Sequence, residues 1–204
     1  MMDKLDFKKT MKPYWQPPVG QFVVVEVPRL NFIKVDGKGD PNTAVEYGTA
    51  VQWLYTMSYT LKFTSKSDGR DYGVAPLEGL WWAEDMSSFG SGNKDDWLWT
   101  AMIMQPDWID AAMFAKALDK AKGKLGAPPP SLRLEAFDEG LSVQTMHVGP
   151  YSAEAPTIAK LHGEFLPANG LVENGHHHEI YISDPGRTAP EKLKTVIRQP
   201  VRRR

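Results

Sequence analysis

Two stretches of the chain, 31–105 and 141–201, contain the same order of predicted elements. In each, a strand and a turn rich in Gly or Pro precede a helix, and two further strands follow. Few residues are identical between the stretches, so the repeat is one of pattern. This order predicts an α+β fold, a tandem pseudo-twofold repeat of strand-helix-strand-strand units with a ligand groove where the units join.

The length of 204 residues suits one domain, 1–204, with a first half at about 19–126 and a second half at about 131–201. A stiff Ala-Pro-Pro-Pro segment at 127–130 separates the halves. No apolar run approaches the roughly 20 residues that a bilayer span needs, and no apolar signal sequence opens the chain. We therefore expect a cytoplasmic protein with no membrane partner.

Composition narrows the chemistry further. Lys and Arg number 24 and Asp and Glu number 25, so the net charge of −1 argues against a nucleic-acid partner. Cysteine is absent, which excludes disulfides, thiolate metal sites and cysteine nucleophiles. No phosphate loop, dinucleotide fingerprint or nucleophile elbow occurs. The sequence thus predicts no cofactor, a small hydrophobic or aromatic ligand as partner, and a monomer or weak homodimer.

Local patterns place the elements along the chain. Residues 1–18 are predicted to be an irregular lead-in, and 87–94 and 167–175 are predicted to be a turn and a loop. Strands are predicted at 22–27, 31–35, 74–85, 97–105, 132–137, 141–148, 177–183 and 195–201. Helices are predicted at 43–63, after a cap at Asp107, at 151–165 and, for a short helix, at 188–194.

The segment 176–183, with the sequence HHHEIYIS, stands out for its polar side chains. Because alternate residues of a strand share a face, His177, Glu179 and Tyr181 should point one way and Ile180 the other. If the isoleucine face packs into the core, the face with Glu179 meets either solvent or a cleft. The three adjacent histidines suggest a metal site only weakly, since no paired ligand spacing accompanies them, and we predict no metal.

The aromatic content is high, with seven Trp, seven Tyr and eight Phe. Along the predicted strand at 74–85, Trp81 and Trp82 point to opposite faces, and Gly79 would let another group approach the backbone. The two indoles could form an aromatic wall of a ligand cleft, or they could simply pack against neighbouring strands.

Several stretches together resemble the GyrI-like small-molecule-binding family, to which the ligand-binding domains of multidrug-sensing transcription regulators are related. The resemblance runs from about Tyr14 to Val201. It depends on FIKVDG at 32–37, YTLKF at 59–63, PLEGLWW at 76–82, HVGPY at 147–151, HHEIY at 177–181 and DPGRTAPEKLK at 184–194. No helix-turn-helix segment precedes these stretches, so the resemblance does not imply a transcription factor.

The resemblance also implies roles for individual residues. Glu179 takes the place of the acidic residue that contacts cationic or polar ligands in the family. Aromatic positions of the groove correspond to Trp82, Tyr55, Tyr59 and Tyr151. Trp81 is a further aromatic candidate from the strand pattern, and Tyr181, Tyr55, Tyr59 and His147 are candidates for a second proton-handling group.

The stand-alone family members most similar to this chain include enzymes that open the cyclopropane ring of DNA-alkylating cyclopropanoid natural products. This likeness implies detoxification by hydrolysis, with Glu179 and Tyr181 as the catalytic pair. Burial among aromatic rings is expected to raise the pKa of Glu179, which would let the residue protonate a dienone carbonyl or orient water. Two alternatives remain: a protein that binds or senses such compounds without turnover, and an interaction protein with an exposed Trp patch.

Overall fold

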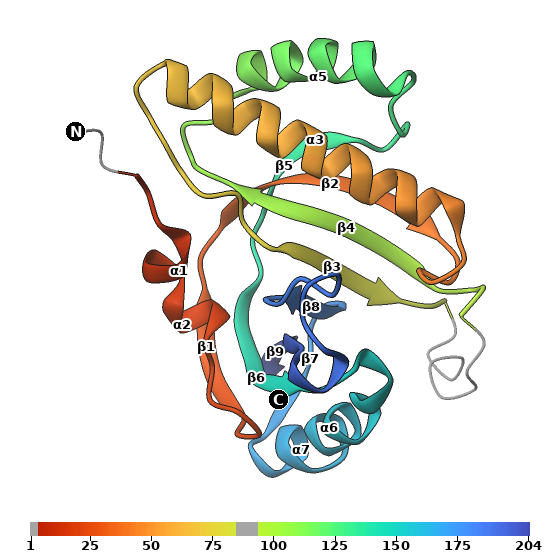
Figure 1. The fold of residues 1–204 in the computed structure, drawn as a ribbon. Coiled ribbons are helices and arrows are strands. Elements are labelled where there is room, and N and C mark those ends of the chain that lie inside the picture. Colours follow the sequence, from red (N-terminus) through yellow and green to blue (C-terminus); the bar gives the residue numbers. More distant parts are fainter. Residues whose placement is uncertain (1–3, 85–93) are drawn as a thin grey trace. The chain divides into compact units, whose positions relative to one another are not determined.

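The structure, a computed structural model, describes residues 4–84 and 94–204 (Figure 1). Only the last residue of the turn predicted at 87–94 lies inside these ranges. The contacts divide the chain into two compact units, Met1–Thr10 with Leu30–Phe137, and Met11–Arg29 with Asp138–Arg204. This division differs from the sequence halves because a strand from each half is built into the other unit.

The first unit contains an antiparallel sheet in the order β3-β4-β2-β5. Its strands are β2 (Leu30–Lys38), β3 (Leu77–Trp82), β4 (Leu98–Gln105) and β5 (Arg133–Phe137). Its helices are α1 (Phe7–Thr10), α3 (Val45–Ser67) and α5 (Ala111–Leu125). Helix α3 contacts β2 and β4, so it covers the sheet, and it also packs against α5 (Figure 1).

Spacing of apolar residues explains how α3 packs. The buried residues Ala50, Trp53, Leu54, Met57 and Leu61 recur at intervals of three and four, which places them on one face of the helix. Tyr55, one of the predicted aromatic groove residues, is 36% exposed. A single face of α3 meets the sheet, and Tyr55 lies outside it.

Helix α5 begins at a different cap from the predicted one. The side chain of Asp110, not Asp107, accepts a hydrogen bond of 2.8 Å from the backbone N–H of Met113 and satisfies a donor of the first turn. The helix ends at Gly126, whose φ of +83° is a backbone conformation that favours glycine.

The second unit has an antiparallel sheet in the order β1-β6-β9-β8, with β7 paired to β9. Its strands are β1 (Val23–Val27), β6 (Gly140–Val148), β7 (Leu171–Glu173), β8 (His177–Tyr181) and β9 (Lys194–Arg203). Its helical turns are α2 (Lys12–Trp15), η1 (Tyr151–Ala153), α6 (Ala155–Lys160), the π-helical η2 (Leu161–Phe165), α7 (Leu166–Ala168) and η3 (Pro190–Lys192).

The hydrophobic core of this unit lies between its sheet and its helical segment. Buried side chains of both meet there, namely Val143, Leu161, Leu166, Leu171, Ile197 and Val201. The rings of Phe22 and Phe165 close its edge with centroids 5.2 Å apart. Three local predictions need correction: the lead-in contains α1 and α2, the helix at 151–165 is a series of short helical turns, and the loop at 167–175 contains β7.

The predicted α+β class is confirmed. In each of the two repeated stretches, the strand before the helical segment pairs with the last strand of the stretch, β2 with β4 and β6 with β9. The last strand in turn lies next to the one before it, β3 or β8. The pseudo-twofold relation and the single-domain assignment of 1–204 remain predictions from the sequence. No helix in residues 4–84 and 94–204 combines the length and the apolar composition of a membrane span.

A buried ionic cluster joins the strands of the second unit. The carboxylate of Glu139 contacts His178 Nδ1 at 2.7 Å and Arg198 Nη1 at 2.9 Å. Arg198 also donates to Gln144 Oε1 at 3.0 Å and to the carbonyl of Tyr14 at 2.6 Å. The partners of the arginine thus lie on β6, in the turn before it and in the N-terminal α2 segment, which holds these three parts of the unit together.

Candidate functional site

Strand β8 presents the polar face that the sequence predicted. Glu179 Oε1 lies 3.2 Å from His177 Nε2, and Glu179 Oε2 accepts a 2.8 Å hydrogen bond from the hydroxyl of Tyr181. The three side chains therefore share one face, as strand alternation requires. The side chain of Glu179 is 16% exposed and that of His177 is 7% exposed, so this face is not an open, solvated surface.

Two of the predicted residues approach this face from the end of β6. Tyr151 begins η1, and its ring centroid lies 5.5 Å from that of Tyr181 in an edge-to-face arrangement with an interplanar angle of 76°. His147 Nε2 lies 3.3 Å from the carbonyl oxygen of Pro150, beside the turn that leads to Tyr151. The unit thus brings Glu179, Tyr181 and Tyr151 into one cluster, with His147 at the adjacent turn.

A residue that the sequence reasoning missed is Glu154. This residue is 4% exposed and lies just before α6, and its side chain is one of the groups that lower the pKa of Glu179. No sequence motif includes Glu154, because its effect on Glu179 follows from the fold of the segment after β6.

His177 is the second residue without an assigned role. Strand alternation had placed it on the face of Glu179, and the spacing of two residues was the signal that could have found it. Its Nδ1 is buried and has no hydrogen-bond partner within the described part of the chain.

The expectation of a raised pKa for Glu179 is wrong. Burial acts in that direction, but hydrogen bonds and charge interaction with His177 outweigh it, and hydrogen bonds from Tyr181 and Glu154 add to the effect. The pKa of Glu179 is therefore lowered, since each of these partners stabilises the charged form. Glu179 is a carboxylate at neutral pH, which suits it to attract a cation or to accept a proton.

The remaining predicted residues lie in the first unit. Trp81 is 3% exposed and belongs to an aromatic cluster in which its ring centroid lies 5.7 Å from that of Tyr47 and 6.0 Å from that of Trp97. A Cβ at residue 79 would lie 2.7 Å from Trp81 Nε1, so Gly79 admits the close approach that the sequence predicted. Trp82 is half-buried and stands opposite Leu98 on β4.

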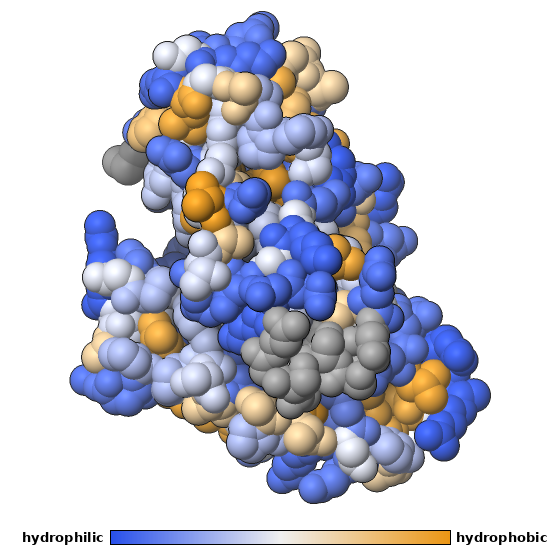
Figure 2. All heavy atoms as spheres, turned by 90° about the vertical axis from the view of Figure 1, so that its right-hand side faces the viewer, coloured by the Kyte–Doolittle hydropathy of each residue, from blue (hydrophilic) through white to orange (hydrophobic). Residues whose placement is uncertain are grey.

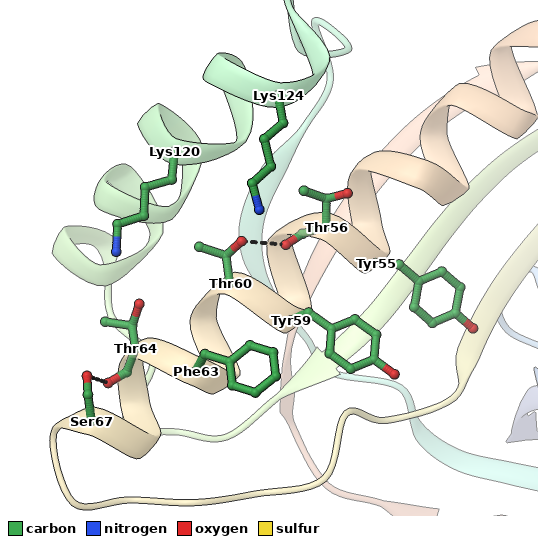
Figure 3. Close-up of a pocket in the computed structure, with 9 residues that line it drawn as sticks. All are labelled: Tyr55, Thr56, Tyr59, Thr60, Phe63, Thr64, Ser67, Lys120 and Lys124. Carbon is green, nitrogen blue, oxygen red and sulfur yellow. Dashed lines mark hydrogen bonds between the residues drawn. The ribbon is translucent and has the colours of Figure 1, made fainter.

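Tyr55 and Tyr59 line an open groove along α3, with a volume of about 600 Å³ (Figure 3). Their rings are stacked with centroids 6.5 Å apart, and Phe63 continues the stack at 6.4 Å. Figure 3 shows these rings on one side of α3, whereas Lys120 and Lys124 of α5 approach the threonine side of the helix. The volume is within the range of small-molecule sites, and the stacked rings offer flat surfaces to a ligand.

The burial of the tryptophans argues against the alternative of an interaction protein with an exposed Trp patch. All seven tryptophans lie in the described ranges, and none of their side chains is exposed. On the face drawn in Figure 2, hydrophobic residues are interspersed with hydrophilic ones wherever the atoms are coloured. An exposed Trp patch is therefore not a feature of this protein.

Comparison with known proteins identifies the family. Residues 20–202 match the GyrI-like small molecule binding domain, so the chain belongs to this family. The resemblance seen in the sequence is thus confirmed. Comparison with curated proteins gives no match.

Solved structures agree with this assignment. An uncharacterized conserved protein from Listeria innocua has 41% sequence identity and a TM-score of 0.88, and the alignment covers 98% of this chain and 100% of that one. A protein from Listeria innocua described as a hydrolase has 40% identity and a TM-score of 0.84 with the same coverage. The C-terminal domain of EcmrR shares the fold at 12% identity and a TM-score of 0.56, over 90% of this chain and 98% of that one.

Proposed function

We propose that this protein binds flat hydrophobic or cationic small molecules at the cluster of Glu179, Tyr181 and Tyr151, and that it hydrolyses cyclopropanoid compounds as a means of detoxification. The observation that carries the proposal is a poorly exposed carboxylate that accepts hydrogen bonds from His177 and Tyr181 beside a pair of phenol rings. Such rings favour flat ligands, and the carboxylate favours positive charge. The likeness to the Listeria hydrolase over 98% of the chain favours the catalytic form.

The reaction requires little machinery because the strained ring supplies the driving force. Water attacks a cyclopropane carbon and forms a C–O bond, while the ring C–C bond breaks and its electron pair moves into the conjugated dienone. The carbonyl oxygen then takes up a proton and becomes a phenol, and the water loses one. Glu179, as a carboxylate, is suited to accept the proton of the water, and Tyr181 is placed to share proton transfer through its bond to Glu179.

A direct test is incubation with a cyclopropanoid compound followed by mass spectrometry. We expect a product heavier by one water, formed at a rate proportional to protein concentration. Absence of that product, with binding of the compound retained in equilibrium dialysis, would favour the alternative of a protein that sequesters or senses these ligands without turnover.

The proposal also includes a cytoplasmic location. Absence of cysteine fits action in a reducing cytoplasm.

Trp82 of the first unit tests the aromatic ligand contact that the family resemblance implies. Replacement of Trp82 by Ala should weaken the binding of a flat aromatic ligand and reduce the quenching of Trp fluorescence, because a stacking surface is lost. Trp82→Phe, which keeps an aromatic ring at the position, serves as the matched control and should bind more tightly than Trp82→Ala. Equal affinities of all three proteins would refute a ligand-binding role for Trp82.

A further inference from the structure

The groove along α3 in the first unit has no part in the proposed function, which is centred on Glu179 of β8. Its volume of about 600 Å³ suits a small molecule. The lining combines three kinds of groups, namely aromatic rings, hydroxyls and ammonium groups (Figure 3). Because neither Asp nor Glu occurs among the nine lining residues, the two lysines give this lining a positive charge.

The aromatic side of the groove is formed by rings at every fourth residue of α3, which we call the aromatic ladder: Tyr55, Tyr59 and Phe63. All three side chains are exposed, up to 61% for Phe63, so the ladder can be reached from solvent. Consecutive rings have interplanar angles of only 28° and 26°. Such nearly parallel rings offer a flat apolar surface to a planar ligand.

The ammonium groups come from α5, across the groove from the ladder. Lys120 and Lys124 are exposed and four residues apart, so they lie on the same face of α5, and they approach the threonine side of α3 (Figure 3). Within residues 4–84 and 94–204 neither lysine forms an ion pair, whereas Lys122 of the same helix lies 3.9 Å from Asp119. The two groove lysines can therefore bind an anion without breaking an existing ion pair.

The hydroxyls between the ladder and the lysines already use protons within the helix. Thr60 Oγ1 donates to the carbonyl oxygen of Thr56 at 2.7 Å, and Ser67 Oγ donates to that of Thr64 at 2.7 Å. A hydroxyl has only one proton to donate. Hydrogen bonds to an acidic ligand group are therefore expected mainly from the two lysines.

We propose that this groove binds flat aromatic anions, whose ring system lies against the aromatic ladder while a carboxylate, sulfonate or phosphate group meets Lys120 and Lys124. The charge preference is opposite to that of the proposed site at Glu179, where a carboxylate favours cations. A neutral aromatic ligand would not use the ammonium groups, and an inorganic anion would not use the rings. Both parts of the ligand should therefore contribute to affinity.

The test is a fluorescence anisotropy titration of the full chain with 1-pyrenesulfonate, and with 1-pyrenemethylammonium as a cation on the same ring system. In Lys120→Gln/Lys124→Gln the affinity for the sulfonate should fall about 10-fold, and the affinity for the ammonium compound should not fall. The matched control is Lys116→Gln/Lys122→Gln, which removes the same charge from exposed positions of α5 outside the groove lining. This control should bind the sulfonate nearly as tightly as wild type.

The aromatic ladder gives the second readout. Tyr59→Leu should weaken the binding of 1-pyrenesulfonate, whereas Tyr59→Phe, which keeps the ring, should not. Inorganic sulfate at the same concentration should not displace the probe. Glu179→Gln should bind 1-pyrenesulfonate as wild type does, so a failure of the proposed hydrolase function would leave this result unchanged.

Two outcomes would overturn the proposal. One is an equal affinity of the Lys120→Gln/Lys124→Gln protein and its control for 1-pyrenesulfonate. The other is a lack of probe binding together with a dimer in sedimentation velocity that Tyr59→Leu abolishes, which would assign the groove to a second copy of the chain.

Discussion

Replacement of Glu179 by Gln should lower the rate of cyclopropanoid hydrolysis by at least about 100-fold, the lower end of what a general acid or base contributes. The amide has the shape of the carboxylate but cannot accept the proton of the attacking water. Affinity for the neutral compound should change only a few fold, because the phenol rings of Tyr151 and Tyr181 stay in place. The measurement is a single-turnover rate together with a binding titration.

The charge of the ligand provides a second test of the Glu179→Gln variant. The affinity for ethidium, a flat permanent cation, should fall in Glu179→Gln, whereas the affinity for phenanthridine, the neutral parent ring, should not, since only the cation interacts with the carboxylate charge. Glu191→Gln is the matched control, because Glu191 is an exposed glutamate of η3 in the same unit and the substitution makes the same change in charge. A Glu179→Gln protein with the turnover of the control would refute the catalytic role of Glu179.

The largest effect on stability is expected from Glu139→Gln. The side chains of Glu139 and Arg198 are 1% and 3% exposed, and Glu139 also contacts His178. Removal of the negative charge leaves the Arg198 guanidinium buried without its counter-ion, which costs about 3–5 kcal/mol in comparable buried pairs. That is a large share of the roughly 5–15 kcal/mol by which a domain is stable. Chemical denaturation should show the loss as a lower midpoint.

Acid should reproduce part of this loss in the wild type. His178 and Arg198 hold the pKa of Glu139 at about 2, against an ordinary value of 4.5, although burial opposes the shift. A folded-state pKa below the unfolded one means that the stabilisation is complete above pH 4.5 and is lost as the pH falls toward 2. The free energy of unfolding should therefore fall over this window in wild type, and less steeply in Glu139→Gln.

The double variant Glu139→Gln/Arg198→Gln separates a pair interaction from general disruption. If the charges act mainly on one another, the double variant should be less destabilised than the sum of the two single variants. Strict additivity would show that the two residues act independently, contrary to their 2.9 Å contact.

Local rules were enough to predict much of the site. The twofold period of a strand predicts that His177, Glu179 and Tyr181 share one face, and the hydrogen bonds between them confirm it. The class of fold followed in the same way, from the order of strands and helices. Where local rules competed, as at the start of α5, the choice between Asp107 and Asp110 needed the actual path of the backbone.

The properties that decide the chemistry were set by tertiary structure. Glu154 and Glu179 are distant in sequence, so no periodicity relates them, and the effect of Glu154 on the pKa of Glu179 arises only from the fold of the segment after β6. The direction of the pKa shift of Glu179 depended on these partners, and burial alone gave the wrong sign. The sequence determined which side chains share a strand face, because that geometry repeats every two residues. The fold decided which charges and protons they meet, because those contacts come from distant segments.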